Sequence, residues 1–102
     1  MAEPTRILVV DDAPEYAAMV VELLRASDAW KDAVTATALT YDDALRVMTA
    51  QRFDIALFDY MLGARDGLSL LREVRQRGID TAVVVLTGRG AEEIAVEAMK
   101  SG

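Results

Sequence analysis

The chain contains no cysteine and no histidine. The absence of cysteine excludes disulfides and thiolate metal sites, and the absence of histidine removes the usual zinc ligand and the usual general base. No hydrophobic run approaches the roughly 20 residues of a membrane-spanning helix, and residues 1–6, Met-Ala-Glu-Pro-Thr-Arg, lack the character of a signal peptide. Any chemistry must therefore depend on carboxylates, hydroxyls, amines or a bound hard cation, and we expect a cytoplasmic protein with no membrane contact.

Positive charge is also scarce. The 102 residues include 11 Lys and Arg against 17 Asp and Glu, which gives a net charge of −6. This balance argues against binding of a phosphate backbone, so we expect no direct nucleic-acid binding by this segment. Solubility alone is the simpler interpretation of the charge. The length and the 53% hydrophobic content suit one domain, residues 1–102, that buries somewhat over about 60% of its unfolded surface.

Two strand-length runs are apolar throughout, Ile55–Phe58 and Ala82–Leu86. A strand that is apolar on both faces is usually covered on both faces, as in the interior of a parallel α/β sheet. A β-branched run predicts another strand over Arg6–Val10, and an alternation of Val and Thr with Ala indicates a weaker one over Ala33–Leu39.

Helical periodicity follows each of these strands. Pro14 suits a first helical turn, Thr40 and Asp66 are cap residues, and Gly78 is a C-terminal stop. The pattern predicts helices from Pro14 to about Ser27, from Thr40 past Met48, from Asp66 to Gly78 and from about Ala91 to Ser101. The predicted inward-facing residues are Ala17, Val20, Val21 and Leu24 in the first helix, Tyr41, Ala44, Leu45 and Met48 in the second, and Leu68, Leu71 and Val74, with Leu70 flanking, in the third.

The alternation of strands and helices predicts an α/β fold, a parallel sheet with helices on both faces and right-handed crossovers. Polar side chains stand at the carboxyl ends of three strands: Asp11 and Asp12 after the first, Asp59 after the third and Thr87 after the fourth. In open parallel sheets, sites gather in the crevice beyond these strand ends.

The acidic residues carry the strongest functional signal. If the first and third strands are neighbours, their carboxylates lie within roughly 5 Å, because adjacent strands are about 4.8 Å apart. At an effective dielectric constant of 20, each such pair repels by roughly 3 kcal/mol. These segments contain no histidine or nearby lysine to offset the repulsion. A divalent cation is the natural remedy, and an all-oxygen site that keeps several waters suits Mg²⁺.

Each of these residues alone has a simpler structural interpretation. Asp11 or Asp12 could cap the helix that begins near Pro14, Asp59 could terminate a strand, and Thr87 could be a turn residue before a glycine. Their coincidence at the carboxyl ends of strands in one α/β pattern favours a functional site.

Three segments at characteristic spacing resemble the receiver domain of two-component response regulators: Ile7–Asp12, Asp59–Gly67 and Val84–Gly88. Residues 95–102 also resemble the end of that family's fourth helix. The resemblance covers nearly the whole chain and implies a flavodoxin-like, doubly wound sheet with strand order 2-1-3-4, in which the first and third strands are neighbours.

The resemblance also implies roles for five residues. Asp59 would be the phospho-acceptor, taking a phosphoryl group from the phosphohistidine of a histidine kinase or phosphotransfer protein. Asp12 and Asp59 would bind Mg²⁺ through their side chains, Asp11 would assist, and Met61 would offer its backbone carbonyl. The Thr87 hydroxyl would hold a phosphoryl oxygen, and its loop and the following helix would switch an output. Such a protein is a signalling module that catalyses only its own phosphorylation and dephosphorylation.

The family has a lysine on a fifth strand, followed by a fifth helix, and this chain ends at Gly102 before that unit. Lys100 matches the end of a helix and does not match the active lysine, so we expect the 102-residue segment to phosphorylate poorly or to hold phosphate abnormally. Without a fifth strand, Ala82–Leu86 is expected to be an exposed edge through which the chain could form a homodimer.

The same residues also bear on other functions. A Mg²⁺-dependent phosphatase of the haloacid-dehalogenase type needs Asp-x-Asp after its first strand, whereas Asp11 and Asp12 are contiguous here. A flavodoxin needs a phosphate loop rich in hydroxyls and glycine, whereas this loop is acidic. A receiver-like module that acts only through protein contacts, without phosphorylation, is the remaining alternative.

Overall fold

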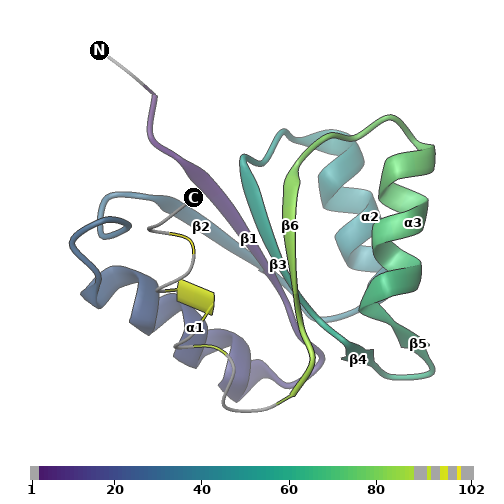
Figure 1. Cartoon of the computed structure of the whole chain (residues 1–102), viewed down its shortest axis with the longest axis horizontal. Coiled ribbons are helices and arrows are strands. Elements are labelled where there is room, and N and C mark those ends of the chain that lie inside the picture. Colours follow the sequence, from purple (N-terminus) through teal and green to yellow (C-terminus); the bar gives the residue numbers. More distant parts are fainter. Residues whose placement is uncertain (1–2, 89–91, 93–94, 97–98, 100–102) are drawn as a thin grey trace.

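The computed structural model describes residues 3–88, 92, 95–96 and 99. Its centre is a four-stranded parallel sheet in the order β2-β1-β3-β6, which confirms the predicted order 2-1-3-4 of the long strands. Helix α1 covers one face of this sheet, and helices α2 and α3 cover the other (Figure 1). The bounds are β1 Arg6–Val10, α1 Pro14–Ala26, β2 Val34–Ala38, α2 Tyr41–Ala50, β3 Ile55–Asp59, α3 Gly67–Gln76 and β6 Ala82–Leu86.

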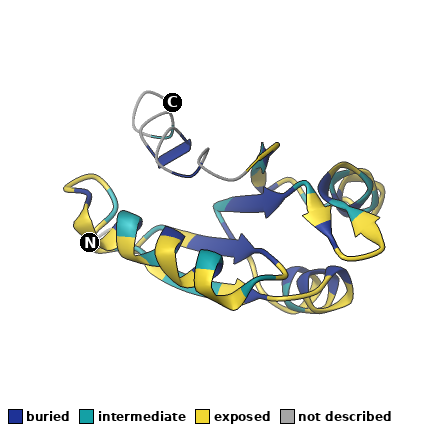
Figure 2. Ribbon diagram, turned by 90° about the horizontal axis from the view of Figure 1, so that it is seen from below, coloured by how far each residue is buried: buried dark blue, intermediate teal, exposed yellow. Residues whose placement is uncertain are grey.

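The sheet separates two hydrophobic clusters. Alternate residues of β1 point to opposite faces: Ile7 and Val9 pack on the α1 side, and Leu8 and Val10 pack on the α2–α3 side. Figure 2 shows the central strands buried and the outer faces of the helices exposed. Because both faces of β1 and β3 are covered, every residue of Ile7–Val10 and of Ala56–Phe58 is buried, as their unbroken apolar runs predicted.

The predicted helix boundaries in the middle of the chain are confirmed. The Thr40 side chain accepts a hydrogen bond from the Asp43 N–H at 3.0 Å and caps α2. Asp66 caps α3 in the same way. At the other end of α3, Gly78 has φ +78°, and the Ile79 N–H donates to the Val74 carbonyl at 3.1 Å, which together form a Schellman stop.

The inward face of α3 differs from the prediction. Leu70 and Val74 are fully buried and Leu71 is partly buried, whereas Leu68 is 40% exposed. The start of the helix explains the difference, because Gly67 is buried against the backbone of β3. Positions 67, 70 and 74 therefore line the inner face, and residue 68 is rotated away from it.

The segment between β3 and α3 is also more ordered than the glycine-containing loop that the sequence indicated. It contains a small antiparallel hairpin of β4, Met61–Leu62, and β5, Arg65–Asp66. Gly63 adopts φ +70° in the turn that joins them, a conformation that favours glycine.

Most of the predicted last helix, residues 91–101, lies outside the described residues. Those that are described within it, Glu92, Ala95, Val96 and Met99, are helical, and Ala95 and Val96 are buried in the α1-side cluster. Among the helices that the structure describes, none is both long enough and apolar enough to cross a membrane.

Candidate functional site

The register of the sheet gathers the predicted site residues at one edge. Val10, the last residue of β1, pairs with Phe58 of β3, so Asp11 and Asp12 follow β1 next to the position where Asp59 ends β3. Asp59 in turn pairs with Leu86 of β6. Thr87 therefore follows the neighbouring strand at the same edge, and it is exposed.

The three carboxylates form a compact cluster. Carboxylate oxygens of Asp11, Asp12 and Asp59 all lie within 4.8 Å of one another, as expected from the spacing of adjacent strands. Asp11 is 2% exposed and Asp59 is 6% exposed, whereas Asp12 is exposed at the rim. Two of the three acidic groups are therefore inside the protein and one faces solvent.

The backbone that follows Asp59 is held by hydrogen bonds. The Tyr60 N–H donates to the Leu86 carbonyl at 2.8 Å, and the Gly67 N–H donates to the Tyr60 carbonyl at 2.8 Å. The Met61 N–H donates to Oδ1 of Asp59 at 3.4 Å. The backbone that follows Asp59 is therefore held to β6 on one side and to the start of α3 on the other.

Gly67 is a component of the site that sequence reasoning missed. A Cβ at this position would lie 2.6 Å from the backbone oxygen of Asp59, closer than real Cβ contacts allow. Only glycine lets α3 begin this close to the end of β3. The signal in the sequence is the pair Asp66-Gly67 at a helix start, where a glycine directly after the cap residue indicates close packing of the helix start.

Asp11 has a structural role beside its place in the cluster. Its N–H donates to the Ala38 carbonyl at 3.1 Å, and its Oδ1 accepts from the Ala13 N–H at 2.9 Å. These bonds hold the turn that leads into α1. The N-cap of α1 is Ala13, and no side chain caps that helix, so the interpretation of Asp11 or Asp12 as a helix cap is wrong.

The donor set fits a hard divalent cation. Within the described part of the chain, Asp11, Asp12 and Asp59 are the one cluster of three acidic side chains close enough to hold a metal ion. Carboxylate oxygens with a solvent-facing side are the ligands that Mg²⁺ prefers, because this ion keeps part of its water shell. Met61, whose carbonyl was the fourth predicted ligand, lies in β4 beside Asp59 and is 61% exposed.

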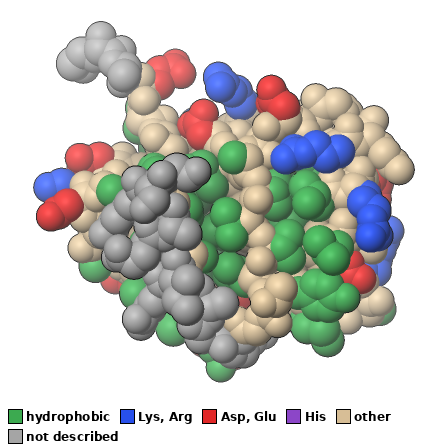
Figure 3. Space-filling view, in the orientation of Figure 1, with side chains coloured by type: hydrophobic (Ala, Val, Ile, Leu, Met, Phe, Trp, Pro, Cys, Tyr) green, Lys and Arg blue, Asp and Glu red, His purple; other side chains and the backbone are tan. Residues whose placement is uncertain are grey.

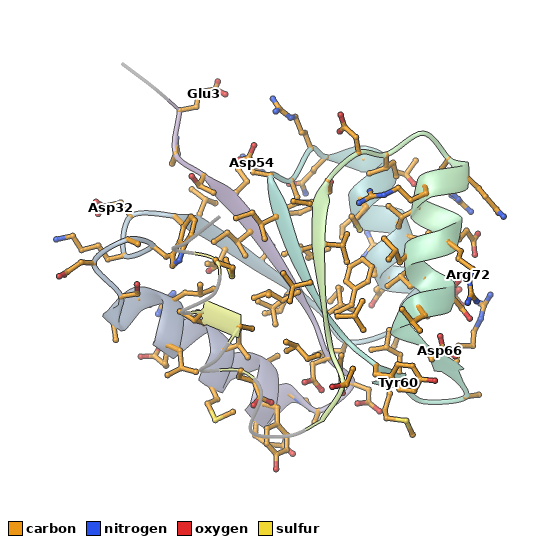
Figure 4. All side chains as sticks on the ribbon, viewed as in Figure 1. Glu3, Asp32, Asp54, Tyr60, Asp66 and Arg72 are labelled. Atoms are coloured by element: carbon orange, nitrogen blue, oxygen red, sulfur yellow. The ribbon has the colours of Figure 1, made fainter. Side chains whose placement is uncertain are left out.

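Not every aspartate near β3 belongs to the site. Asp54 lies at the opposite end of β3 from Tyr60, as Figure 4 shows. Its Oδ2 accepts from the Arg6 N–H at 2.8 Å, and its Oδ1 lies 3.6 Å from the Arg52 guanidinium. Asp54 therefore joins β1 to β3 at the amino edge of the sheet, far from the acid cluster.

A second polar group, also missed from the sequence, lies where the hairpin meets α2 and α3. Burial and a hydrogen bond to Glu73 raise the pKa of Tyr41 above its usual value of 10.0. The hydrogen bonds from Tyr41 and Arg77 lower the pKa of Glu73. The backbone N–H of Ser69 lowers the pKa of Asp66, the cap of α3.

A doubly wound parallel sheet with a cluster of carboxylates at the carboxyl ends of two neighbouring central strands defines this protein as a flavodoxin-like domain. The sequence pattern of the response regulator receiver domain matches residues 7–102, and the chain belongs to that family.

Comparison with individual proteins agrees with this assignment. The chain is 31% identical over 101 residues to the C4-dicarboxylate transport transcriptional regulatory protein DctD of Pseudomonas aeruginosa, a match covering 96% of this chain and 20% of that protein. It is 32% identical over 100 residues to the probable transcriptional regulatory protein TcrX of Mycobacterium tuberculosis, covering 98% of this chain and 41% of that protein. The chain thus spans about a fifth to two fifths of the length of these relatives.

Solved structures show the same fold. The receiver domain of the Francisella response regulator 1452 is 28% identical, with a TM-score of 0.73 over 96% of this chain and 78% of that chain. The CheY-like receiver domain from Methylobacillus flagellatus is 22% identical, with a TM-score of 0.75 over 92% of this chain and 81% of that chain, a likeness of fold.

Proposed function

We propose that this receiver domain accepts a phosphoryl group on Asp59 from the phosphohistidine of a histidine kinase or phosphotransfer protein. The observation that carries the proposal is the position of Asp59, which is 6% exposed at the end of β3 and clustered with two other carboxylates. A carboxylate oxygen of Asp59 attacks the phosphorus, the P–N bond to the donor imidazole breaks, and an acyl phosphate forms on Asp59.

The fixed surroundings of Asp59 suit this reaction. Phosphoryl transfer depends on alignment and on neutralisation of charge more than on a protein base. The hydrogen bonds at Tyr60 and Met61 supply the alignment. Asp12 and Asp59 would hold Mg²⁺ through their side chains, with Asp11 assisting and the Met61 carbonyl as a further donor. When bound, the ion neutralises charge on the carboxylates and on the transferred group.

Thr87 is proposed as the residue that reads the phosphorylated state. It follows β6, whose Leu86 pairs with Asp59, so its hydroxyl can reach a phosphoryl group that extends from Asp59. Rearrangement of this loop and of the helix that follows would transmit the signal. The relatives are named as transcriptional regulators; here we propose a cytoplasmic signalling module whose own surface does not bind DNA.

The test is formation of a stable phosphoryl-mimic complex. Beryllofluoride with Mg²⁺ should shift the amide resonances of residues around Asp59 and Thr87, and Asp59→Asn should abolish the shift. Asp54→Asn is a matched control, because Asp54 precedes β3, at the end of the strand opposite to Asp59. A response that persists in Asp59→Asn would refute the proposal, and no response in folded wild-type protein would favour the module that acts through protein contacts alone.

We also propose that a second copy of the chain can pair along the edge of β6. Within the described residues, the outer side of this strand has no partner strand, and its five residues are all apolar. Figure 3 shows hydrophobic side chains gathered in the middle of this view of the molecule, which looks onto β6. Such an edge is a template for pairing.

The hydrogen-bond pattern of β6 defines how two copies would meet. The Ala82 N–H donates to the Asp54 carbonyl, and the Leu86 carbonyl accepts from the Tyr60 N–H, so these residues face β3. By alternation, Val83 and Val85 present their backbone groups outward. Antiparallel pairing about a two-fold axis at Val84 would then form two reciprocal Val83–Val85 pairs.

Sedimentation velocity over a range of concentrations tests the pairing. Val83→Pro removes one outward N–H without removing a bond to β3, and proline is tolerated in edge strands. We expect this variant to be monomeric where the wild type is dimeric. Val34→Lys on β2, the opposite edge strand, is the control that should still dimerise. A monomeric wild type, or a Val83→Pro dimer, contradicts the pairing.

A further inference from the structure

The β4–β5 hairpin that follows Asp59 is attached to α2 by one side chain. The guanidinium of Arg65, in β5, lies over the ring of Tyr41, with its Cζ 3.6 Å from the ring centroid. Tyr41 is the first residue of α2 and is only 5% exposed. The arginine therefore covers the remaining outer side of a ring that is otherwise packed in the core cluster of α2 and α3.

Acidic groups on two helices surround the same guanidinium. Arg65 lies 3.6 Å from Oδ1 of Asp42 on α2 and 3.9 Å from Oε1 of Glu73 on α3. The Tyr41 hydroxyl donates to Oε1 of Glu73 at 2.7 Å, and Arg77 binds the other oxygen of Glu73 at 2.9 Å. The hairpin, α2 and α3 thus meet at one cluster built on Arg65, Tyr41 and Glu73.

On the hairpin side, this cluster is connected to Asp59, the proposed phospho-acceptor, through Leu62 and Met61. Arg65 pairs with Leu62 across the hairpin. Leu62 follows Met61, whose N–H donates to Oδ1 of Asp59. A displacement of β5 would therefore be transmitted to the residue that contacts the Asp59 carboxylate and carries the proposed carbonyl ligand.

On the α2 side, the path returns to the other half of the acid cluster. Tyr41 begins α2 three residues after Ala38, the last residue of β2. The Ala38 carbonyl accepts from the Asp11 N–H. The contact between Arg65 and Tyr41 therefore links the segment that follows Asp59 to the segment whose Ala38 carbonyl binds the Asp11 N–H.

We propose, resting on the function proposed above, that Arg65 is a positioning residue: by holding the hairpin against Tyr41, it sets Met61 beside Asp59 and thereby the affinity of the acid cluster for a divalent cation. The stacked contact is the essential part. The hydroxyl of Tyr41 contacts Glu73. Glu73 in turn lies beside the Arg65 guanidinium, and in the described contacts it does not bind the backbone of the hairpin.

Calorimetric titration with Mg²⁺ alone tests the proposal on the purified 102-residue chain. Arg65→Met keeps an apolar stem and removes the planar cation, and we expect its dissociation constant for Mg²⁺ to rise about 10-fold, the lower end of the effect of losing a supporting partner. Tyr41→Phe keeps the ring under Arg65 and should retain most of the affinity. Arg46→Met is the matched control, since Arg46 is an exposed arginine of α2 paired with Asp43.

Hydrogen exchange of the amides of residues 61–66 reports on the hairpin separately. Faster exchange in Arg65→Met together with weaker Mg²⁺ binding supports the positioning role. Unchanged Mg²⁺ affinity in that variant overturns it, even if exchange becomes faster. If Arg65→Met does not fold, Arg65→Lys, which keeps the charge and loses the planar stack, takes its place with the same expectation. A wild type that binds no Mg²⁺ overturns both this inference and the metal site of the proposed function. Equal Mg²⁺ affinity in the wild type and in the Arg65 variant overturns the inference alone.

Discussion

The backbone oxygen of Asp59 lies so close to Gly67 that a Cβ on residue 67 would be 2.6 Å away. The end of β3, which carries the proposed phospho-acceptor Asp59, and the first residue of α3 are therefore in direct backbone contact. This contact is possible only at a residue without a side chain.

Replacement of Gly67 should lower the stability of the fold and weaken the binding of a phosphoryl mimic at Asp59. In Gly67→Ala, the new methyl group must displace α3 or the Asp59 backbone, and we expect a loss of roughly 1–3 kcal/mol in the free energy of unfolding, as for other overpacked sites. Urea denaturation measures the loss, and beryllofluoride binding should weaken in parallel. Gly88→Ala is the stability control, since a Cβ there meets nothing within 4 Å; equal stability of the two variants would contradict the role given to Gly67.

Removal of one carboxylate from the acid cluster should stabilise the metal-free protein. Asp12 is the exposed member, so Asp12→Asn relieves a screened repulsion of about 1 kcal/mol. The wild type should gain stability when Mg²⁺ is added, because the ion binds the folded state, and the variant should gain much less. Thermal unfolding with and without millimolar Mg²⁺ distinguishes the two. A destabilised Asp12→Asn protein in metal-free buffer would count against the repulsion.

Acid should weaken the fold through the cap of α3. The pKa of Asp66 lies below its ordinary value of 3.8 in the folded state, because the Ser69 N–H binds the ionised carboxylate. A depressed pKa means that the stabilisation is present above the unfolded pKa and is lost as the pH falls through the folded one. Asp66→Asn keeps a good cap residue and should flatten the stability profile below about pH 4. An unchanged acid limb in this variant would contradict the assignment; comparison at pH 7 checks that the cap is intact.

Stability should also fall at high pH, through ionisation of Tyr41. Its pKa is raised above 10.0 by burial and by the bond to Glu73, so the folded state retains the proton longer than the unfolded state. Stability from this group is therefore complete below pH 10 and is lost as the pH rises above it. We expect Tyr41→Phe to be less stable than the wild type near pH 7 but to lose less stability between pH 9 and 11. Urea midpoints at several pH values test this, and parallel curves for the two proteins would refute it.

Much of the site could be predicted because its chemistry is local to strand ends. Asp11, Asp12 and Asp59 each follow an apolar strand directly, and the 4.8 Å spacing of strands then determines how far apart they are. Periodicity does not predict that β1 and β3 are adjacent, because hydrophobic patterns do not encode strand order. That adjacency is implied only by the resemblance to receiver domains.

The parts that could not be predicted depend on tertiary packing. Arg65 and Tyr41 are separated by 24 positions in the sequence, and no periodic pattern links a hairpin arginine to a buried helix-start tyrosine. Strands β4 and β5 have two residues each, which is too few to show the alternation that predicts a strand. Helical spacing places Leu68 with Leu71 on the inner face, whereas the close approach of Gly67 to β3 sets the rotation that turns Leu68 outward.

The unequal depth of the three carboxylates has a kinetic consequence. With Asp12 at the rim and Asp11 and Asp59 beneath it, a cation held at the proposed site would enter and leave through the solvent-facing side of the cluster. Exchange would then be limited by shedding of the ion's own hydration water, a step at which Mg²⁺ is reluctant, and the filled fraction of sites would follow the ambient free concentration of the ion rather than the history of the protein.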